Sequence, residues 1–333
     1  MAEWLYEAGI GEERAALVED GAIVEARIEP ERETARAGAI IGAKLSEITA
    51  GGRCGKLTID NGEEALIEPA PTGVTEGASL FVKIARERIV ENWGVKLAKA
   101  KHRPEADEAR AALSLRQQLS ATGHSVRDLA SHHPDTLEEA GWYELLEQAR
   151  SGVVRFSGGA LRISLTPAMT VIDVDGALPP AELAVAGARA GGGAIRRFGI
   201  AGSIGIDLPT LEAKGDRQAA AAALDETLPR PFERTAVNGF GFLQIVRRHA
   251  RPSLLELAQS GDAGFATCAL LRRAERSKGK GDRTISAHPA IIGYLENKPE
   301  WLAALERRLG AGVKLQSHPA IALHSGEISA THP

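Results

Sequence analysis

Cysteine is nearly absent from this sequence: Cys54 and Cys268 are the only two among 333 residues. Two cysteines are too few for a disulfide framework, and too few for a zinc site built from cysteine alone. We interpret both as free thiols of a protein in a reducing compartment, and we therefore expect a cytoplasmic location.

Long apolar runs are also missing, and aromatic residues make up only 4% of the chain. No stretch approaches the roughly 20 apolar residues that a membrane-spanning helix needs, so we expect no membrane partner. The first residues, MAEWLYEAGIGEE, are acidic rather than basic and then apolar, so we expect no signal peptide. The chain is nevertheless 44% hydrophobic and can build the cores of two or three modest domains.

An overall excess of positive charge is lacking, because the formal net charge is −4. Proteins that hold phosphate groups are usually basic. Basic residues nevertheless dominate the segment from 247 to 283, and a local basic surface can bind nucleic acid. A solvated helix face explains the same pattern, and from charge alone we favour that interpretation.

The first hundred residues favour β-strands. Apolar runs flank Asp20-Gly21, a turn dipeptide, which predicts an antiparallel hairpin. The segments from 39 to 101 are short and rich in turns, and Asn61-Gly62 gives a second hairpin signal. Several short strands at this spacing predict a small β-barrel.

Residues 104–148 change in character. EADEARAALSLRQQLSA and DTLEEAGWYELLEQAR have helical periodicity and few β-branched residues, so we expect helices there. His132-His133 lies between them, and without further ligands we interpret this pair as part of a loop rather than a metal site.

Strands and helices alternate beyond residue 152. We predict strands in GVVRFSGGALRISL, TVIDVDG, GSIGID and FERTAVNG, and helices at 180–194, in GDRQAAAAALDETL and in FGFLQIVRRHA as far as Pro252. This alternation predicts a mostly parallel α/β layer. The triplet Gly191–Gly193 lacks the Lys-Ser/Thr of a phosphate loop, so we interpret it as a helix end.

Two of these strands carry carboxylates at their ends. Asp173 and Asp175 interrupt the apolar residues of TVIDVDG, and Asp207 closes GSIGID. Sites in such sheets form at the carboxyl ends of strands, so Asp173 and Asp207 are expected to come together. Taken singly, each Asp fits a helix or turn cap equally well.

Several segments resemble the bacterial ribonuclease E/G family. FGFLQIVRRHARPSL resembles its FGLLEMSRQR…RPSL segment, TVIDVDG its AIDINS-like strand, and GSIGIDLPTL its GGLIVIDFIDM strand. The opening hairpin EERAALVEDGAIVEARIE and the tail are also similar to family segments. The resemblance covers nearly the whole chain and is strongest from 153 to 254.

The resemblance implies an α/β (α+β) fold of several parts. These are an RNase H-like lobe interrupted by an OB-type β-barrel, followed by a DNase I-like α/β catalytic layer and a small C-terminal α/β lobe. The corresponding ranges are 1–38 with 137–165 for the RNase H-like lobe, 39–101 for the RNA-binding barrel, 102–136 for a helical region replacing the 5′ sensor, 166–259 for the catalytic domain and 260–333 for the C-terminal domain.

The implied activity is Mg²⁺-dependent endonucleolytic cleavage of single-stranded RNA, in RNA processing or decay, with Mn²⁺ able to replace Mg²⁺. The two metal-binding and catalytic aspartates of the family match Asp173 and Asp207. Asp175 stands where the family usually has Asn, and we assign it a supporting role. Two close carboxylates would repel each other without a cation, so within this framework we favour the metal over two separate caps.

RNA-binding roles are expected for Arg247, Arg248 and Arg251, which are predicted on a helix and suit phosphate oxygens. A charged outer helix face is the alternative. Phe240 could pack under a base or staple the helix to the sheet, and we favour core packing. Trp93 and Lys96 are assigned to RNA binding in the barrel region.

The sequence also departs from the family. No Cys-x-x-Cys follows the RPSL segment, so we expect no structural zinc and no zinc-linked tetramer, whereas a homodimer is compatible with the sequence. Thr58 and Ile67 stand where stacking aromatics are expected in the barrel. These losses favour an alternative, an RNA-binding protein of the same fold with weakened or lost catalysis. A metal-dependent phosphodiesterase acting on another substrate is a third hypothesis.

Overall fold

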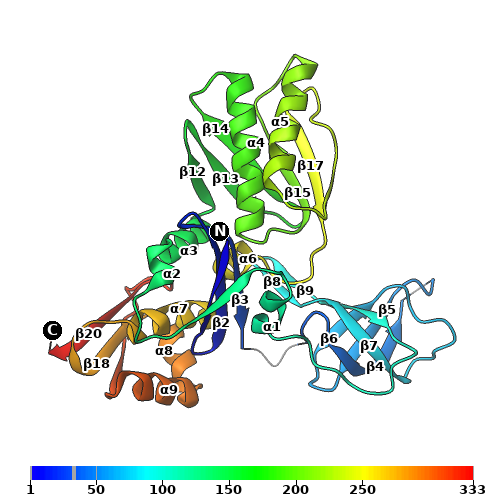
Figure 1. Cartoon of the computed structure of the whole chain (residues 1–333). Helices are drawn as coiled ribbons and strands as arrows, with labels where there is room; N and C mark the ends of the chain where they lie inside the picture. Colours follow the sequence, from blue (N-terminus) through cyan, green and yellow to red (C-terminus); the bar gives the residue numbers. More distant parts are fainter. Residues whose placement is uncertain (1, 32–34, 50, 333) are drawn as a thin grey trace. The chain divides into compact units, whose positions relative to one another are not determined.

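The computed structural model describes residues 2–31, 35–49 and 51–332 of a mixed α/β protein (Figure 1). The chain divides into two compact units. Unit 1 comprises residues 1–31, 119–146 and 257–333, and unit 2 comprises residues 32–118 and 147–256. Each unit is therefore assembled from segments that are distant in the sequence.

Unit 1 begins with the predicted hairpin. Its four-stranded sheet has the order β11-β1-β2-β3, with β1 Glu3–Ala8, β2 Glu12–Glu19, β3 Ala22–Pro30 and β11 Ser125–Leu129. Strands β2 and β3 pair antiparallel, and Asp20 and Gly21 form the turn with φ of 51° and 79°. Positive φ at both positions is the geometry for which Asp-Gly is suited, so the hairpin prediction is confirmed.

The C-terminal residues build a buried core that one N-terminal residue joins. They form α7 Ala263–Glu275, β18 Lys280–Ala287, α8 Pro289–Glu296, α9 Pro299–Leu309, β19 Val313–Ser317 and β20 Gly326–His332, with sheet order β19-β18-β20. Ile10, beside the hairpin, belongs to the same buried cluster as Leu271, Ile285 and Trp301. A side chain at Gly11 would meet the Trp301 ring at 2.4 Å, so the chain packs closely there. Residues 257–333 thus belong to unit 1, and the core that they build includes Ile10 from the N-terminal segment.

The segment 102–151 is less helical than predicted. Leu115–Ser120 (α1) is the described helical part of EADEARAALSLRQQLSA, and Ser125–Leu129 is a strand that pairs parallel with β1. DTLEEAGWYELLEQAR does form helices, α2 Thr136–Glu139 and α3 Trp142–Ser151. The long helix prediction fails because polar helix formers at 105–112 have few apolar neighbours to pack against.

Unit 2 contains a closed five-stranded barrel of order β10-β6-β5-β4-β7. Its strands are β4 Ile40–Ile48, β5 Gly55–Ile59, β6 Glu64–Ile67, β7 Ser79–Arg86 and β10 Ala98–His102. Leu45, Leu57, Ile67 and Ile84 fill its interior, and Gly62 makes the β5–β6 turn with φ of 83°. The barrel prediction is confirmed, and an OB-type barrel has this strand number. β8 Ile89–Glu91 and β9 Gly94–Lys96 form a separate two-stranded sheet.

The second part of unit 2 is a six-stranded sheet of order β12-β13-β14-β15-β17-β16. Its strands are β12 Val153–Phe156, β13 Gly159–Leu165, β14 Thr170–Gly176, β15 Gly202–Asp207, β16 Glu233–Arg234 and β17 Phe242–Arg247. Strands β12 and β13, assigned by sequence to the first lobe, thus pair into the same sheet as β14. The β14–β15 pair is parallel and the other pairs are antiparallel, so the mostly parallel layer was a wrong prediction.

The difference arises at residues 242–247. They were predicted to be helical but form β17, which pairs antiparallel with β15 and with β16. Leu243 and Ile245 are buried and alternate with Phe242, Gln244 and Val246, which is a strand period rather than a helical one. The predicted strand FERTAVNG shrinks to the two residues of β16.

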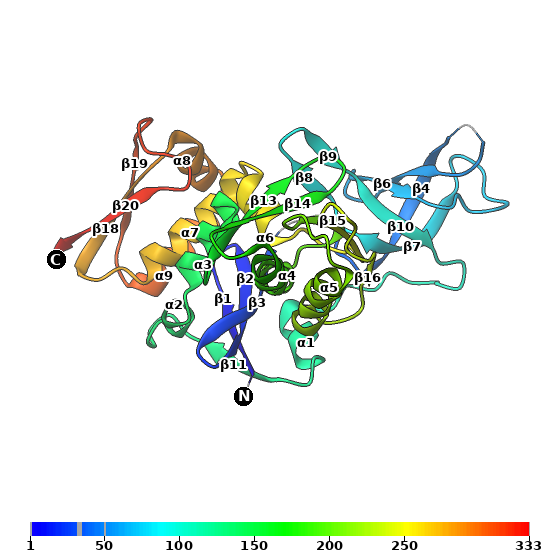
Figure 2. The same cartoon turned by 90° about the horizontal axis from the view of Figure 1, so that it is seen from above.

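Helices α4 (Pro180–Arg197) and α5 (Lys214–Thr227) cover one face of this sheet (Figures 1 and 2). The glycine triplet lies inside α4 and does not end it, contrary to our prediction. A side chain at Gly187 would lie 2.3 Å from Val174, and one at Gly192 would lie 2.2 Å from Thr227 of α5. These glycines therefore let α4 approach both the sheet and α5 closely.

None of the helices in the described part of the chain has both the length and the hydrophobicity to span a lipid bilayer.

Candidate functional site

The two predicted metal ligands are direct neighbours in the sheet. Asp173 of β14 pairs in register with Asp207 of β15 across the parallel strands. Adjacent strands lie about 4.8 Å apart, so the two side chains start from neighbouring points. The same row continues on both sides, to Arg162 of β13 and to Phe242 of β17. One row of the sheet thus carries a cation, two carboxylates and an aromatic ring.

The carboxylates lie on the face of the sheet that α4 and α5 leave uncovered. Val174 of β14 and Ile206 of β15 meet α4 at Gly187 and Gly191. Because successive side chains of a strand point to opposite faces, Asp173, Asp175 and Asp207 point away from these helices. Asp173 is partly buried, whereas Asp175 and Asp207 are exposed. All three are within reach of a ligand from solvent.

The electrostatics of the row show the crowding of negative charge. Burial, followed by the charges of Asp175 and Asp207, raises the pKa of Asp173. A like charge nearby disfavours the ionised form, as expected for two carboxylates one strand apart. Asp175 is paired with Arg162, whose Nε donates a hydrogen bond to its Oδ2 at 2.9 Å.

Few protein ligands are gathered at this point. Within residues 2–31, 35–49 and 51–332, no group of three or more His, Cys, Asp or Glu side chains is arranged to hold a metal. Mg²⁺ does not need such a group, because it often binds through one or two carboxylates, with waters and substrate phosphate oxygens completing the shell. Asp173 and Asp207 fit this kind of site and do not fit a closed structural metal site.

The Phe240 loop lies beside Asp207. Phe240 is 81% exposed, so the predicted core packing is wrong for this ring. The Asn238 side chain accepts hydrogen bonds from the backbone N–H groups of Phe240 and Phe242, at 2.9 and 3.0 Å. Gly241, at φ of 90°, lies against the backbone carbonyls of Leu208 and Pro209, where a side chain would clash at 2.2 Å. The loop is therefore fixed to the end of β15, with the ring projecting outward.

The three predicted RNA-binding arginines do not share a helix. Arg247 ends β17, and its Nη1 donates to the carbonyl of Ile200 at 2.9 Å and to that of Ile195 at 3.4 Å. Arg251 donates to the Gln118 side chain. Arg248 is exposed in the connection after β17. Arg247 and Arg251 thus have structural partners, and Arg248 is the most accessible of the three.

Trp93 and Lys96 belong to the β8–β9 hairpin rather than to the closed barrel. Both interact with Glu91, Trp93 through its indole N–H at 3.0 Å and Lys96 through an ion pair at 2.5 Å. Trp93 is 45% exposed, so its ring is accessible. In the barrel, Thr58 is exposed, whereas Ile67 is fully buried and cannot stand in for a surface aromatic.

Arg162 and Asn238 are site residues that the sequence reasoning missed. Side chains along ALRISL alternate between the two faces of the sheet, so Arg162 shares a face with Ser164. The chain then returns antiparallel as TVIDVDG, which places Arg162 opposite Asp173. That signal was available in the sequence, but it depends on the register of the hairpin. Asn238 gave no comparable signal, because its role depends on the fold of the loop.

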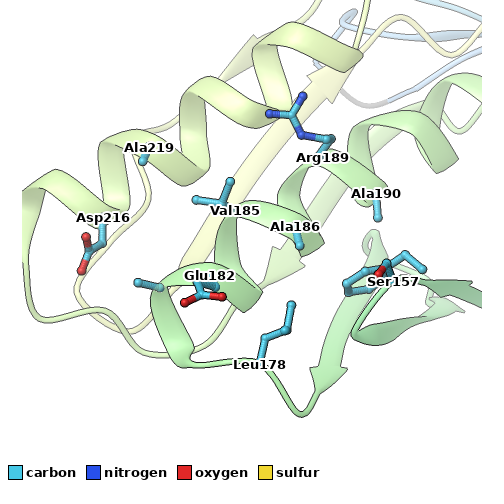
Figure 3. Close-up of a pocket in the computed structure, with 11 residues that line it drawn as sticks. Ser157, Leu178, Glu182, Val185, Ala186, Arg189, Ala190, Asp216 and Ala219 are labelled. Carbon is cyan, nitrogen blue, oxygen red and sulfur yellow. The ribbon is translucent and has the colours of Figure 1, made fainter.

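A separate pocket of about 760 Å³ lies over α4 and α5 (Figure 3). Its lining is mostly apolar and includes Leu178, Val185 and Ala186, with Arg189 and Asp216 extending from the two helices. None of the predicted site residues is among the side chains that line it. It therefore belongs to the helix layer and not to the face with the aspartates.

No protein-family model matches this chain, and no curated protein matches it significantly.

Proposed function

We propose that this protein is a Mg²⁺-dependent endoribonuclease that cleaves single-stranded RNA, as its resemblance to the ribonuclease E/G family implies. The observation that carries the proposal is the in-register pair Asp173–Asp207 on the uncovered face of the six-stranded sheet. The negative charge of Asp207 contributes to the raised pKa of Asp173, and a cation bound beside the two carboxylates would relieve this repulsion.

In this mechanism Asp173 and Asp207 would hold the divalent ion, and Asp175 would support them from the next position on the same face of β14. Mg²⁺ held there would supply a water of lowered pKa and positive charge to offset the charge that develops on the phosphate. The chain itself fixes the two carboxylates by strand register rather than by a mobile loop. Rigid placement matters because small displacements of catalytic groups reduce rates strongly.

The surroundings suit an unpaired strand of nucleic acid. Single-stranded RNA is held by exposed rings on which bases stack, together with cations that contact phosphates. Phe240 offers such a ring beside Asp207, and Arg248 offers an exposed guanidinium. A base within a duplex cannot stack on a side-chain ring in this way, so we infer a preference for single strands.

A second candidate is an RNA-binding protein of the same fold that does not cleave. The buried position of Ile67 and the polar Thr58 favour it, because neither position presents a ring on which an RNA base could stack. The pair Asp173–Asp207 argues for catalysis, since binding RNA alone gives no reason to place two carboxylates next to a phosphate.

Cleavage of a fluorescent single-stranded RNA during a Mg²⁺ titration tests the proposal. The wild type should cut, Asp207→Asn should not, and Asp216→Asn, on the helix layer, should cut as the wild type does. If the wild type and Asp207→Asn both bind RNA and neither cuts, the second candidate stands. Equal cleavage by wild type and Asp207→Asn would refute the assignment of the site.

A further inference from the structure

Arg162 occupies a position in the site that none of the predicted RNA-binding arginines occupies. It lies on β13, directly opposite Asp173, and Asp173 lies directly opposite Asp207. Side chains of paired residues in antiparallel strands start about 4.5–5.5 Å apart on the same face of the sheet. A guanidinium is thus placed next to the proposed metal ligands by strand register.

The hydrogen bonding of Arg162 leaves much of its donor capacity available. Its Nε donates to Asp175 Oδ2, and within the described residues this is the one partner recorded for its guanidinium. The side chain is 63% exposed. Arginine has five N–H donors in a planar fork, so both terminal amino groups can still donate. Such a fork matches two oxygens of one phosphate.

The charges of the row also favour a cation at this point. Asp173, Asp175 and Asp207 with Arg162 carry a formal charge of −2, which one Mg²⁺ neutralises. A phosphodiester adds a further negative charge, and Arg162 is the cation that the row itself supplies. The next arginine on this face of the sheet is Arg155 of β12. It lies opposite Ala160 of β13 and is therefore two strands away from Asp175 of β14.

We propose that Arg162 binds a phosphate of the RNA chain next to the metal, with its Nε remaining on Asp175. This inference rests on the proposed function and deepens it by naming the group that receives the substrate phosphate. In this arrangement Asp175 positions the guanidinium, and the two terminal amino groups contact non-bridging phosphate oxygens. The ligand class is a phosphodiester of an unpaired nucleic-acid strand.

The alternative is an ordinary surface ion pair, which contributes little to stability. The structure offers a matched control in Arg189, which is 53% exposed and paired at 2.8 Å with Glu226 on the helix layer. Arg162 and Arg189 have similar exposure and similar partners but lie on opposite sides of the sheet. Any general effect of removing a surface arginine should therefore be the same for a substitution of Arg162 and for one of Arg189.

The test compares Arg162→Gln with Arg189→Gln for binding of a fluorescent single-stranded RNA in Ca²⁺, across a salt series. Arg162→Gln should weaken binding about tenfold, and the slope of log affinity against log salt should fall by about 0.7, the loss of one phosphate contact. Arg162→Lys should recover part of the affinity, because the charge returns without the fork. Arg189→Gln should match the wild type.

A second measurement separates phosphate binding from simple support of Asp175. Titration with Mn²⁺ alone should show that Arg162→Gln binds the metal as tightly as the wild type or more tightly, because a competing cation is removed. Weaker Mn²⁺ binding would make Arg162 a positioning residue for the carboxylates and overturn the proposal.

The outcomes distinguish this inference from the proposed function. If Asp207→Asn abolishes cleavage but Arg162→Gln binds RNA like Arg189→Gln, the nuclease stands and the role of Arg162 is rejected. If the wild type never cuts but Arg162→Gln lowers the salt slope, the phosphate contact stands without the nuclease. Absence of RNA binding by the wild type rejects both.

Discussion

Asp173 and Asp207 face each other across β14 and β15, the parallel pair of a sheet whose other neighbouring strands run antiparallel. Helix α4 connects these two strands, which is the usual way to return a chain for parallel pairing. Both strands therefore end at the same edge, and each ends near an aspartate. The topology itself brings the two carboxylates together.

Neutralising Asp173 should have opposite effects on stability and activity. Because burial and the charges of Asp175 and Asp207 raise its pKa, the ionised carboxylate is unfavourable in the folded protein. Asp173→Asn should therefore melt at a higher temperature than the wild type without divalent ions. In Mg²⁺ the wild type should gain more stability than the variant, and the variant should lose about 100-fold or more in cleavage rate. A variant that melts lower without metal would contradict the proposed crowding.

Phe240 should contribute to RNA binding and not to the core. Its ring is 81% exposed, so Phe240→Ala should leave the melting temperature unchanged, whereas a core phenylalanine would cost about 3–5 kcal/mol. Loss of one stacking platform should weaken binding of single-stranded RNA about tenfold. Phe242→Ala is the contrasting variant, since that ring covers Gly205 and its removal should lower stability. Unchanged RNA affinity in Phe240→Ala would reject the stacking role.

Arg247 and Arg248 are adjacent but should behave differently. Arg247 satisfies backbone carbonyls of Ile195 and Ile200 at the end of α4, so Arg247→Met should cost about 1–2 kcal/mol of stability. Arg248→Gln should leave stability unchanged and reduce the salt dependence of RNA binding. Chemical denaturation and binding titrations of both variants check this division. If Arg247→Met weakened RNA binding without lowering stability, Arg247 would hold RNA as the sequence predicts.

The sequence predicted the fold best where local chemistry decides it. Asp20 and Gly21 in one hairpin, and Gly62 in the other, adopt the positive φ that the turns require, and the short strands between 39 and 101 close into a barrel. Residues 242–247 were mistaken for a helix because a stretch of leucine, glutamine and arginine has good helix propensity. Pairing with β15 and β16 overrides that propensity, which is a tertiary effect that a local window does not contain.

The site was only partly predictable for the same reason. Asp173 and Asp207 could be found because each ends an apolar strand, and strand ends meet in α/β sheets. Arg162 required the register of β13 with β14, and the outward position of Phe240 required the loop around Asn238. The backbone partners of Arg247 were not foreseen, because a sequence does not show which arginines already donate to backbone carbonyls.

The glycines of α4 provide a direct test of helix–sheet packing. A side chain at Gly187 would lie 2.3 Å from Val174, a branched residue with little freedom to move, so Gly187→Ala should cost about 1–3 kcal/mol. Gly193 lies in the same helix with no atom within 4 Å of such a side chain, so Gly193→Ala should stabilise by about 0.5–1 kcal/mol. Equal effects of the two substitutions in thermal unfolding would contradict the close packing of α4.

The buried charges of unit 1 should make stability depend on pH. Glu7 is 5% exposed and pairs with Arg14, with Arg272 at 3.0 Å and with Arg276 at 2.6 Å. Burial alone would raise its pKa, but these three guanidinium groups lower it to about 2. Because the pKa of Glu7 in the folded protein lies below its ordinary value of 4.5, the carboxylate stabilises the fold fully above pH 4.5. This contribution is lost as the pH falls from 4.5 toward 2.

Glu7→Gln should therefore destabilise the protein by about 3–5 kcal/mol at pH 7, because it leaves three buried guanidinium groups without their shared partner. The difference from the wild type should shrink as the pH falls below 4.5. Burial raises the pKa of Glu12, which gives a contribution of opposite sign, so the difference between variants is more informative than either curve alone. Glu19→Gln, at the exposed end of β2, should follow the wild type at every pH. A destabilisation by Glu7→Gln that persists unchanged at pH 3 would mean that packing, and not the charge of Glu7, holds these arginines in place.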